Sequence, residues 1–304
     1  MSAAREASSL APPSANAGRS GILLMLLTMG FFVSADATAK YLMRSYPVIE
    51  VTWGRFLFHM LLLLPFLLGR GGIVFRSARP RLQLARSALQ IGSTLFYFGA
   101  IAILPLATAV SISFVQPLLI TMLSVPLLGE KVGPRRWTAV LIGFLGVLII
   151  IRPAGFAQWA VLLPLGSAAC SAFYNITTRL VARLDRVETS LFYTAVGGFL
   201  MASLAVPFAW QTPELKGWAL MALTGTLSGS GHFCIIQAYQ RASAAILAPF
   251  SFTQLIWATL IGFLIFGDLP DGWTLLGAVV IVGSGLYVFY REGIRAGASA
   301  AARS

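Results

Sequence analysis

A short polar motif occurs twice in an otherwise apolar sequence. Ser113-Phe114-Val115-Gln116 returns 138 positions later as Ser251-Phe252-Thr253-Gln254. Serine and glutamine three residues apart lie on one face of a helix, where a hydroxyl and an amide can hydrogen-bond a polar solute. The alternative is that these side chains bond neighbouring helices and only hold the bundle together. We expect the two copies to face each other across a substrate pathway, with these contacts to the solute: Ser113, Gln116, Ser251 and Gln254.

Three charged residues of the first two predicted helices form a candidate cluster. Asp36 and Lys40 are four positions apart, one helical turn, so they can pair. Arg55 is expected at a similar depth in the next helix. Such a cluster acts either as a gate of the pathway or as a structural ion-pair network. No second buried carboxylate is expected beside Asp36, so facilitated diffusion and proton exchange both stay open.

A histidine and three aromatic residues complete the candidates. His232 lies near the middle of a predicted helix, after the run Gly225-x3-Gly229-x-Gly231, which favours close helix packing. It is either a ligand contact or gate, or a hydrogen-bonded core residue. Tyr97, Tyr174 and Trp257 offer an apolar wall for a substrate, and the alternative for each is packing against lipid or the core.

Catalytic motifs are absent from the sequence. It contains no GxSxG, no HExxH, no CxxC and no phosphate-binding glycine loop. Cys170 and Cys234 both sit in apolar runs, where small buried thiols are usual. We therefore expect no enzyme activity, no cofactor, no metal site and no disulfide.

The composition is that of a membrane protein. Of the 304 residues, 58% are apolar and only 11% are charged, and the mean hydropathy is +0.82. Soluble domains carry about 25% charged residues. The chain is long enough for about ten membrane spans of roughly 20 residues. The spans are predicted at Gly21–Met43, Val48–Leu68, Leu84–Leu104, Ala107–Leu128, Trp137–Ile151, Trp159–Arg179, Val187–Trp210, Gly217–Ala238, Ala245–Phe266 and Trp273–Tyr290.

Basic residues orient the predicted spans. The net charge of +12 would suggest a nucleic-acid partner in a soluble protein, but in a membrane protein lysine and arginine mark cytoplasmic loops. Most of them fall in the loops on the side of the two termini. Both termini are therefore predicted to be cytoplasmic, and no nucleic-acid partner is expected.

The repeat extends beyond the opening motif. Asp36-x-Thr38-x-Lys40 in the first span is echoed by Asn175-x-Thr177-x-Arg179 in the sixth, 139 positions later. A repeat of five spans places the second copy upside down, so the halves are predicted to be inverted, with a site near the midplane. The predicted divisions are a disordered tail (1–20), two five-helix repeats (21–152 and 157–290) and a cytoplasmic tail (291–304).

Several of these residues resemble the drug/metabolite transporter superfamily, EamA type. They are Lys40, Pro47, Trp53-x-Arg55-Phe56, the segment from Ala107 through Pro117 to Gly129-Glu130, and Trp137 with Gly143 and Gly146. Within the superfamily the chain looks most like bacterial YddG-type exporters of aromatic amino acids. The resemblance implies ten helices in two inverted repeats, a central cavity and alternating access. The second half departs from the pattern, with Tyr193 in the place of Arg55 and Leu255 in that of Pro117.

These observations predict an all-α inner-membrane transporter. We expect it to be a monomer in the lipid bilayer that exports small amphipathic metabolites, above all aromatic or other apolar amino acids. One alternative is a nucleotide-sugar or phosphorylated-metabolite carrier, although the basic residues lie mostly in loops rather than in the predicted cavity. Another is a membrane scaffold that transports nothing.

Overall fold

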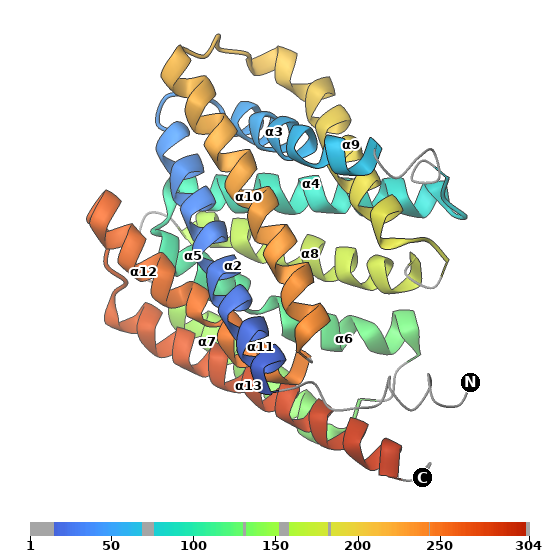
Figure 1. Ribbon diagram of the computed structural model, residues 1–304. Coiled ribbons are helices and arrows are strands. Elements are labelled where there is room, and N and C mark those ends of the chain that lie inside the picture. The colour runs from blue at the N-terminus through green and yellow to red at the C-terminus, as the bar shows by residue number, and fades with distance from the viewer. Residues whose placement is uncertain are drawn as a thin grey trace.

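The computed structural model describes residues 15–68, 76–129, 132–151, 158–181, 184–242 and 244–301, and these ranges contain helices and no strand (Figure 1). The helices of the first half are α2 (Ala15–Leu42), α3 (Val48–Leu68), α4 (Pro80–Ile103), α5 (Leu106–Ser113), α6 (Gln116–Leu128) and α7 (Pro134–Ile151). Those of the second half are η3 (Gln158–Val161), α8 (Leu162–Val181), α9 (Val187–Ala205), η4 (Val206–Ala209), α10 (Leu215–Arg241), α11 (Ala244–Ser251), α12 (Thr253–Phe266) and α13 (Gly272–Ala301).

Helices extend into both predicted tails where the structure describes them. Helix α2 begins at Ala15, within the predicted disordered segment, and residues 1–14 lie outside the described ranges. Helix α13 continues to Ala301, beyond the predicted last span.

Among the described residues, seven helices are long and apolar enough to cross a membrane, and α7 and the first part of α13 are shorter apolar helices. Helix α4 falls in neither group, although it has 24 residues. Its polar residues explain this, because Gln83, Arg86 and Gln90 lie on successive turns and lower its hydropathy. The predicted count of ten spans and the cytoplasmic termini therefore stay predictions.

In each half, two short consecutive helices take the place of one continuous helix: α5 and α6 in the first half, and α11 and α12 in the second. Helix α5 ends at Ser113 and α6 starts at Gln116, and α11 ends at Ser251 just before α12. Pro117 has no N–H, so the carbonyl of Ser113 lacks its usual helical donor. Helices α6 and α12 then end in the same way, each at a glycine in the left-handed conformation: Gly129 with φ 68° and Gly267 with φ 72°.

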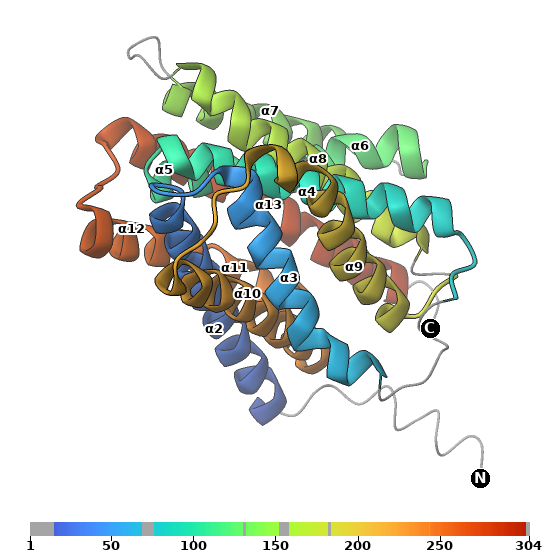
Figure 2. The same ribbon diagram turned by 90° about the horizontal axis from the view of Figure 1, so that it is seen from above.

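The two halves interlock helix by helix. The most extensive helix contacts are α2 with α10, α4 with α8, and α7 with α13, and each pair takes one helix from each half. Figure 1 shows α2 and α10 side by side, and α3, α4, α8 and α6 stacked in that order. Seen from above, α3 and α9 lie on one side and α6 and α7 on the other (Figure 2). The seam between the halves therefore runs through the centre of the molecule.

Candidate functional site

A polar cavity of about 450 Å³ lies on this seam. Its volume falls within the roughly 300–1,000 Å³ of small-molecule sites. The lining residues are Phe32, Asp36, Arg55, Gln90, Ser93, Thr94, Tyr97, Val110, Ser113, Phe114, Gln116, Ser167, Ala168, Ser171, Tyr174, Asn175, Ser228, His232, Ile235 and Gln254. They come from both halves of the chain, so the cavity exists only because the halves pack together.

Two helices supply most of the hydroxyl and amide groups. Helix α4 turns a polar stripe at helical spacing into the cavity: Gln90, Ser93, Thr94 and Tyr97. Helix α8 does the same with Ser167, Ser171, Tyr174 and Asn175. The stripes join at Ser93, whose hydroxyl lies 2.7 Å from that of Ser171 and 3.0 Å from that of Ser167. Of these residues the sequence interpretation found only the tyrosines, although the polar spacing was a usable signal.

The lining follows the sequence repeat. Several pairs of lining residues stand 138 or 139 positions apart, among them Phe32 and Ser171, Asp36 and Asn175, Gln90 and Ser228, Thr94 and His232, Tyr97 and Ile235, and Gln116 and Gln254. Equivalent positions of the two halves therefore face one common space. The expectation that the two copies of the motif share a pathway agrees with this arrangement for their glutamines.

Charge is confined to one half of the cavity. The first half contributes Asp36 and Arg55, whereas the equivalent positions of the second half are Asn175 and Tyr193. The hydroxyl of Tyr97 donates to Asp36 Oδ2 over 3.1 Å. The guanidinium of Arg55 lies 5.3 Å from the centre of the Phe98 ring, within cation–π range. The cavity thus offers one carboxylate and one guanidinium against a neutral, hydroxyl-rich opposite wall.

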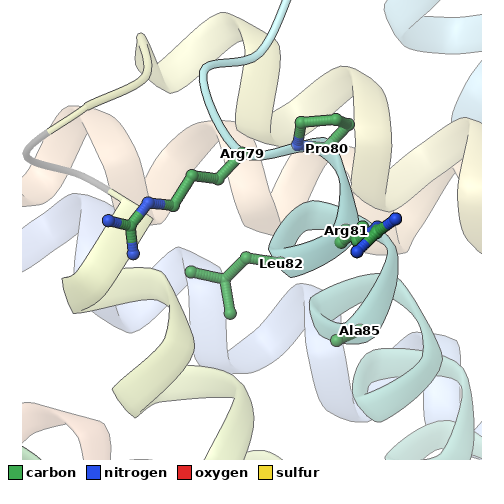
Figure 3. Close-up of a pocket in the computed structure, with 5 residues that line it drawn as sticks. All are labelled: Arg79, Pro80, Arg81, Leu82 and Ala85. Atoms are coloured by element: carbon green, nitrogen blue, oxygen red, sulfur yellow. The ribbon is translucent and has the colours of Figure 1, made fainter.

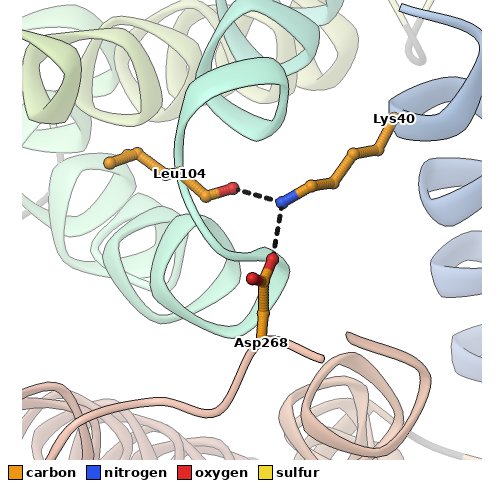
Figure 4. A network of polar contacts seen from close by, with 3 residues as sticks. All are labelled: Lys40, Leu104 and Asp268. Carbon is orange, nitrogen blue, oxygen red and sulfur yellow. Dashed lines mark hydrogen bonds and ion pairs between the residues drawn. The ribbon is translucent and has the colours of Figure 1, made fainter. Parts of the chain in front are cut away.

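The predicted pairing of Asp36 with Lys40 is wrong. Lys40 Nζ donates to Asp268 Oδ2 over 2.9 Å and to the carbonyl of Leu104 over 2.8 Å (Figure 4). Lys40 stands in the last turn of α2, so its long side chain reaches the adjacent α4–α5 and α12–α13 turns. It therefore links three segments at one end of the bundle, outside the cavity lining, while Asp36 faces inward.

A second arginine, Arg86, lies in the first half of α4 and is buried. Arg86 falls at the start of the predicted span Leu84–Leu104, and its side chain is buried in α4. Its guanidinium donates to the hydroxyl of Tyr174 over 3.2 Å, to the carbonyl of Ser190 over 3.0 Å and to Thr194. It also lies 4.9 Å from the centre of the Tyr174 ring. Because Tyr174 lines the cavity, Arg86 fixes one of its walls from behind.

Next to this network, Asp185 ties the start of α4 to the segment before α9. Its carboxylate accepts hydrogen bonds from the N–H of Ala78 (2.7 Å), from Gln83 Nε2 (2.8 Å) and from the hydroxyl of Ser77. Desolvation raises the pKa of this carboxyl, but the three donors outweigh it and leave the pKa below its ordinary value. At neutral pH the ionised Asp185 therefore joins the start of α4 to the start of α9.

Most predicted site residues reach the cavity, and three do not. Those that line it are Asp36, Arg55, Tyr97, Ser113, Gln116, Tyr174, His232 and Gln254. Lys40, Ser251 and Trp257 are not among the lining residues. Trp257 instead packs on α2, where a Cβ built on Gly30 would lie 3.7 Å from its ring, and 37% of it is exposed.

A second hollow of about 540 Å³ lies at the start of α4 (Figure 3). Its lining is Arg79, Pro80, Arg81, Leu82 and Ala85, all from one short stretch of chain. Figure 3 shows the two arginine side chains extending to opposite sides of Leu82. No groups from different helices converge there, so the central cavity is the better candidate site.

The family model of the EamA-like transporter family matches residues 19–152 and again 158–290. The chain belongs to this family. It is therefore a multi-pass membrane protein of a transporter family, built from two copies of the EamA unit. The repeated match agrees with the cavity, whose lining comes from both copies.

Curated relatives of this EamA protein carry different solutes. It is 30% identical over 274 residues to the S-adenosylmethionine uptake transporter of Rickettsia bellii, covering 90% of this chain and 94% of the relative. It is 30% identical over 280 residues to the riboflavin transporter of Rhizobium johnstonii, covering 90% and 91%. The pseudopaline exporter CntI of Pseudomonas aeruginosa is 27% identical over 271 residues, covering 87% and 94%.

A solved crystal structure shares the fold, with a TM-score of 0.61, 20% identity and coverage of 90% of this chain and 96% of the other. The relatives are transporters, in line with the expectation that the protein is not an enzyme. They do not single out the YddG-type exporters of aromatic amino acids that the sequence suggested.

Proposed function

We propose that this protein moves small zwitterionic metabolites with an aromatic or other apolar side group, such as amino acids, across the bacterial inner membrane. The observation that carries the proposal is the presence of one carboxylate, Asp36, and one guanidinium, Arg55, in the same cavity. A solute with an ammonium and a carboxylate group can place an opposite charge beside each of them, whereas a neutral or singly charged solute cannot.

The cavity lining offers a matching group for each part of such a solute. Arg55 is the partner for the carboxylate and Asp36 the partner for the ammonium group. Gln116 and Gln254, from the two copies of the motif, hydrogen-bond the polar head. The rings of Phe32, Phe114 and Tyr174, which all line the cavity, accept the apolar side group.

The relatives support this class of solute. S-adenosylmethionine, which the Rickettsia bellii relative takes up, is an amino acid that also carries an aromatic purine. Riboflavin, carried by another relative, has no amino-acid head. The charged pair therefore favours S-adenosylmethionine and aromatic amino acids over flavins as the solute of this chain.

A phosphorylated solute fits less well. A phosphate needs several cationic or N–H donors, but the described lining offers one guanidinium beside a carboxylate of opposite charge. Arg86 is buried nearby, yet it is not among the lining residues, and one of its terminal nitrogens already bonds Tyr174, Ser190 and Thr194. The nucleotide-sugar alternative is therefore the weaker proposal.

Transport is proposed to follow alternating access between the halves. The link from Lys40 to Asp268 and Leu104 ties α2 to two turns at one end of the bundle, and its release frees that end to open. Export of the solute stays a prediction, since the named relatives include both uptake transporters and an exporter.

Counterflow in proteoliposomes tests the proposal. Vesicles are loaded with one unlabelled solute, and entry of the same labelled solute is followed for phenylalanine, leucine, S-adenosylmethionine and riboflavin. We expect accumulation of at least one zwitterion, loss of it in Asp36→Asn and Arg55→Gln, and retention in the control Trp257→Phe, whose ring lies outside the cavity. Flux of riboflavin alone would contradict the proposed class, and absence of any flux would favour a scaffold.

A further inference from the structure

Two buried polar atoms beside the cavity have no hydrogen-bond partner among the residues that the structure describes. They are Nε2 of His59 and Oγ of Ser228, in side chains that are 7% and 1% exposed. A buried polar atom without a partner costs about 1–3 kcal/mol, so such atoms are rare and call for an explanation. Helical serines usually bond the carbonyl four residues earlier, as Ser87 and Ser111 do here, which makes the unpaired Ser228 the more notable.

His232 adds a third group on the same wall. Its Nδ1 lies 2.9 Å from the carbonyl oxygen of Ser228, which can only accept, so Nδ1 carries the proton. In the neutral ring Nε2 then holds a lone pair. His232 and Ser228 both line the cavity, and no hydrogen bond of Nε2 occurs among the described residues. The lone pair is thus available to a donor.

Glycines bring these groups together. A Cβ on Gly225 would lie 2.9 Å from the backbone of both Arg55 and His59, and one on Gly229 would lie 3.3 Å from the His59 ring. The missing side chains let α10 rest directly on α3. The rings of His59 and His232 therefore stand 5.2 Å apart.

The charged and titratable groups around the two rings define what can bind there. On α3, Arg55 precedes His59 by one turn; on α2, Asp36 lines the same cavity; on α4, Tyr97 donates to Asp36. The Phe32 ring meets His232 edge-on at 5.1 Å and covers one side of it. Two imidazolium rings at 5.2 Å would repel each other, so a positive charge on both rings at once is disfavoured.

We propose that Ser228 and His232, with His59 packed behind them, form a neutral acceptor wall that, next to Asp36, binds the N–H donors of the solute's ammonium group. This inference rests on the proposed function and deepens it, because it assigns the amine rather than the carboxylate to the α3–α10 side. Arriving N–H donors would satisfy groups that have no partner among the described residues. A solute without an amine would leave them unpaired and bind more weakly.

The test compares phenylalanine with 3-phenylpropionate, which has the same ring and carboxylate but no amine. Both are used as competitors of labelled phenylalanine counterflow at one pH, with the wild type, His232→Phe, Ser228→Ala, His232→Gln and the control Trp257→Phe. We expect the wild type and the control to prefer the amine about tenfold or more. We expect the preference to fall to within about threefold in His232→Phe and Ser228→Ala, and to return in part in His232→Gln, whose amide keeps an acceptor.

The result that overturns the inference is an unchanged amine preference in His232→Phe and Ser228→Ala, which would mean that the wall binds water or serves packing alone. Melting temperatures with and without each competitor show that the variants fold and give a second readout of binding. We expect a shift with phenylalanine that both variants lose. Equal inhibition by both competitors in the wild type also overturns the inference but leaves zwitterion transport standing. Absence of any phenylalanine flux overturns both proposals.

Discussion

The aromatic rings of Phe114 and Phe252 lie 4.9 Å apart, centroid to centroid, and are inclined by 54°. Each is the second residue of one copy of the repeated motif, and each stands where its helix breaks. The breaks of the two halves thus touch, and this contact crosses the seam beside the cavity. A ring of Phe252 also approaches α13, where a Cβ on Gly285 would lie 3.2 Å from it.

The first prediction concerns this contact. Phe252 is 9% exposed, and its replacement by alanine leaves a hole and removes the ring pair. We expect Phe252→Ala to cost about 3 kcal/mol and to lower the melting temperature by roughly 5 °C or more. Phe252→Leu should lose less than half as much. Equal melting temperatures for wild type and Phe252→Ala in detergent would show that the ring contact does not stabilise the seam.

The second prediction concerns the paired glutamines. Gln116→Ala and Gln254→Ala each remove a hydrogen-bonding amide from the cavity while leaving the packing of the described core unchanged. We expect each to raise the apparent KM for a zwitterionic solute about tenfold, the loss of one hydrogen bond to a charged group, with expression unaltered. Transport kinetics in proteoliposomes measure this. Wild-type kinetics in both variants would show that the two glutamines do not bind the solute.

The third prediction concerns the link between Lys40 and Asp268. The side chains are 11% and 33% exposed, so water screens the pair only in part. We expect Lys40→Met and Asp268→Asn each to change the transport rate, and the exchange Lys40→Asp with Asp268→Lys to restore some of it. The exchange cannot restore all of it, because the bond from Lys40 to Leu104 is lost. Additive effects of the two single variants would show that the residues act independently.

The fourth prediction is a pH dependence at Asp185. Its folded-state pKa lies below the ordinary value of about 3.9, so its stabilisation is fully present above that pH and is lost as pH falls through the folded-state pKa. We expect Asp185→Asn to melt earlier than the wild type at pH 7, and the difference to shrink below about pH 4. Melting curves over pH 3–7 measure it. If the difference in melting temperature grew as the pH falls, the folded-state pKa of Asp185 would be raised rather than lowered, which would contradict this prediction.

The sequence repeat predicted the cavity better than it predicted individual contacts. Residues such as Gln90 and Ser228 were not singled out, yet they obey the offset of 138 and face the same space. Polar stripes at helical spacing along α4 and α8 were visible in the sequence. They were missed because a hydroxyl in an apolar helix can also bond its own backbone, as Thr94 does to Gln90.

Long side chains account for most of the wrong or incomplete assignments. Lys40 is one turn from Asp36, but its ammonium group reaches Asp268, a residue 228 positions away. Arg86 stands near a predicted loop, yet α8 and α9 bury it. Helical spacing along one chain shows which side chains can meet on that helix. It does not show which turn of another helix lies nearby, and that packing decides the partner.

The central claim is that the transported solute binds in the cavity between the halves. It is tested most directly by thiol labelling in a background of Cys170→Ser and Cys234→Ser, comparing Gln254→Cys in the cavity with Arg81→Cys at the exposed start of α4. Labelling rates are measured with and without a saturating solute that counterflow has shown to be transported. We predict that the solute slows labelling at position 254 about tenfold or more and leaves position 81 unchanged. Equal labelling at position 254 with and without the solute would contradict the account.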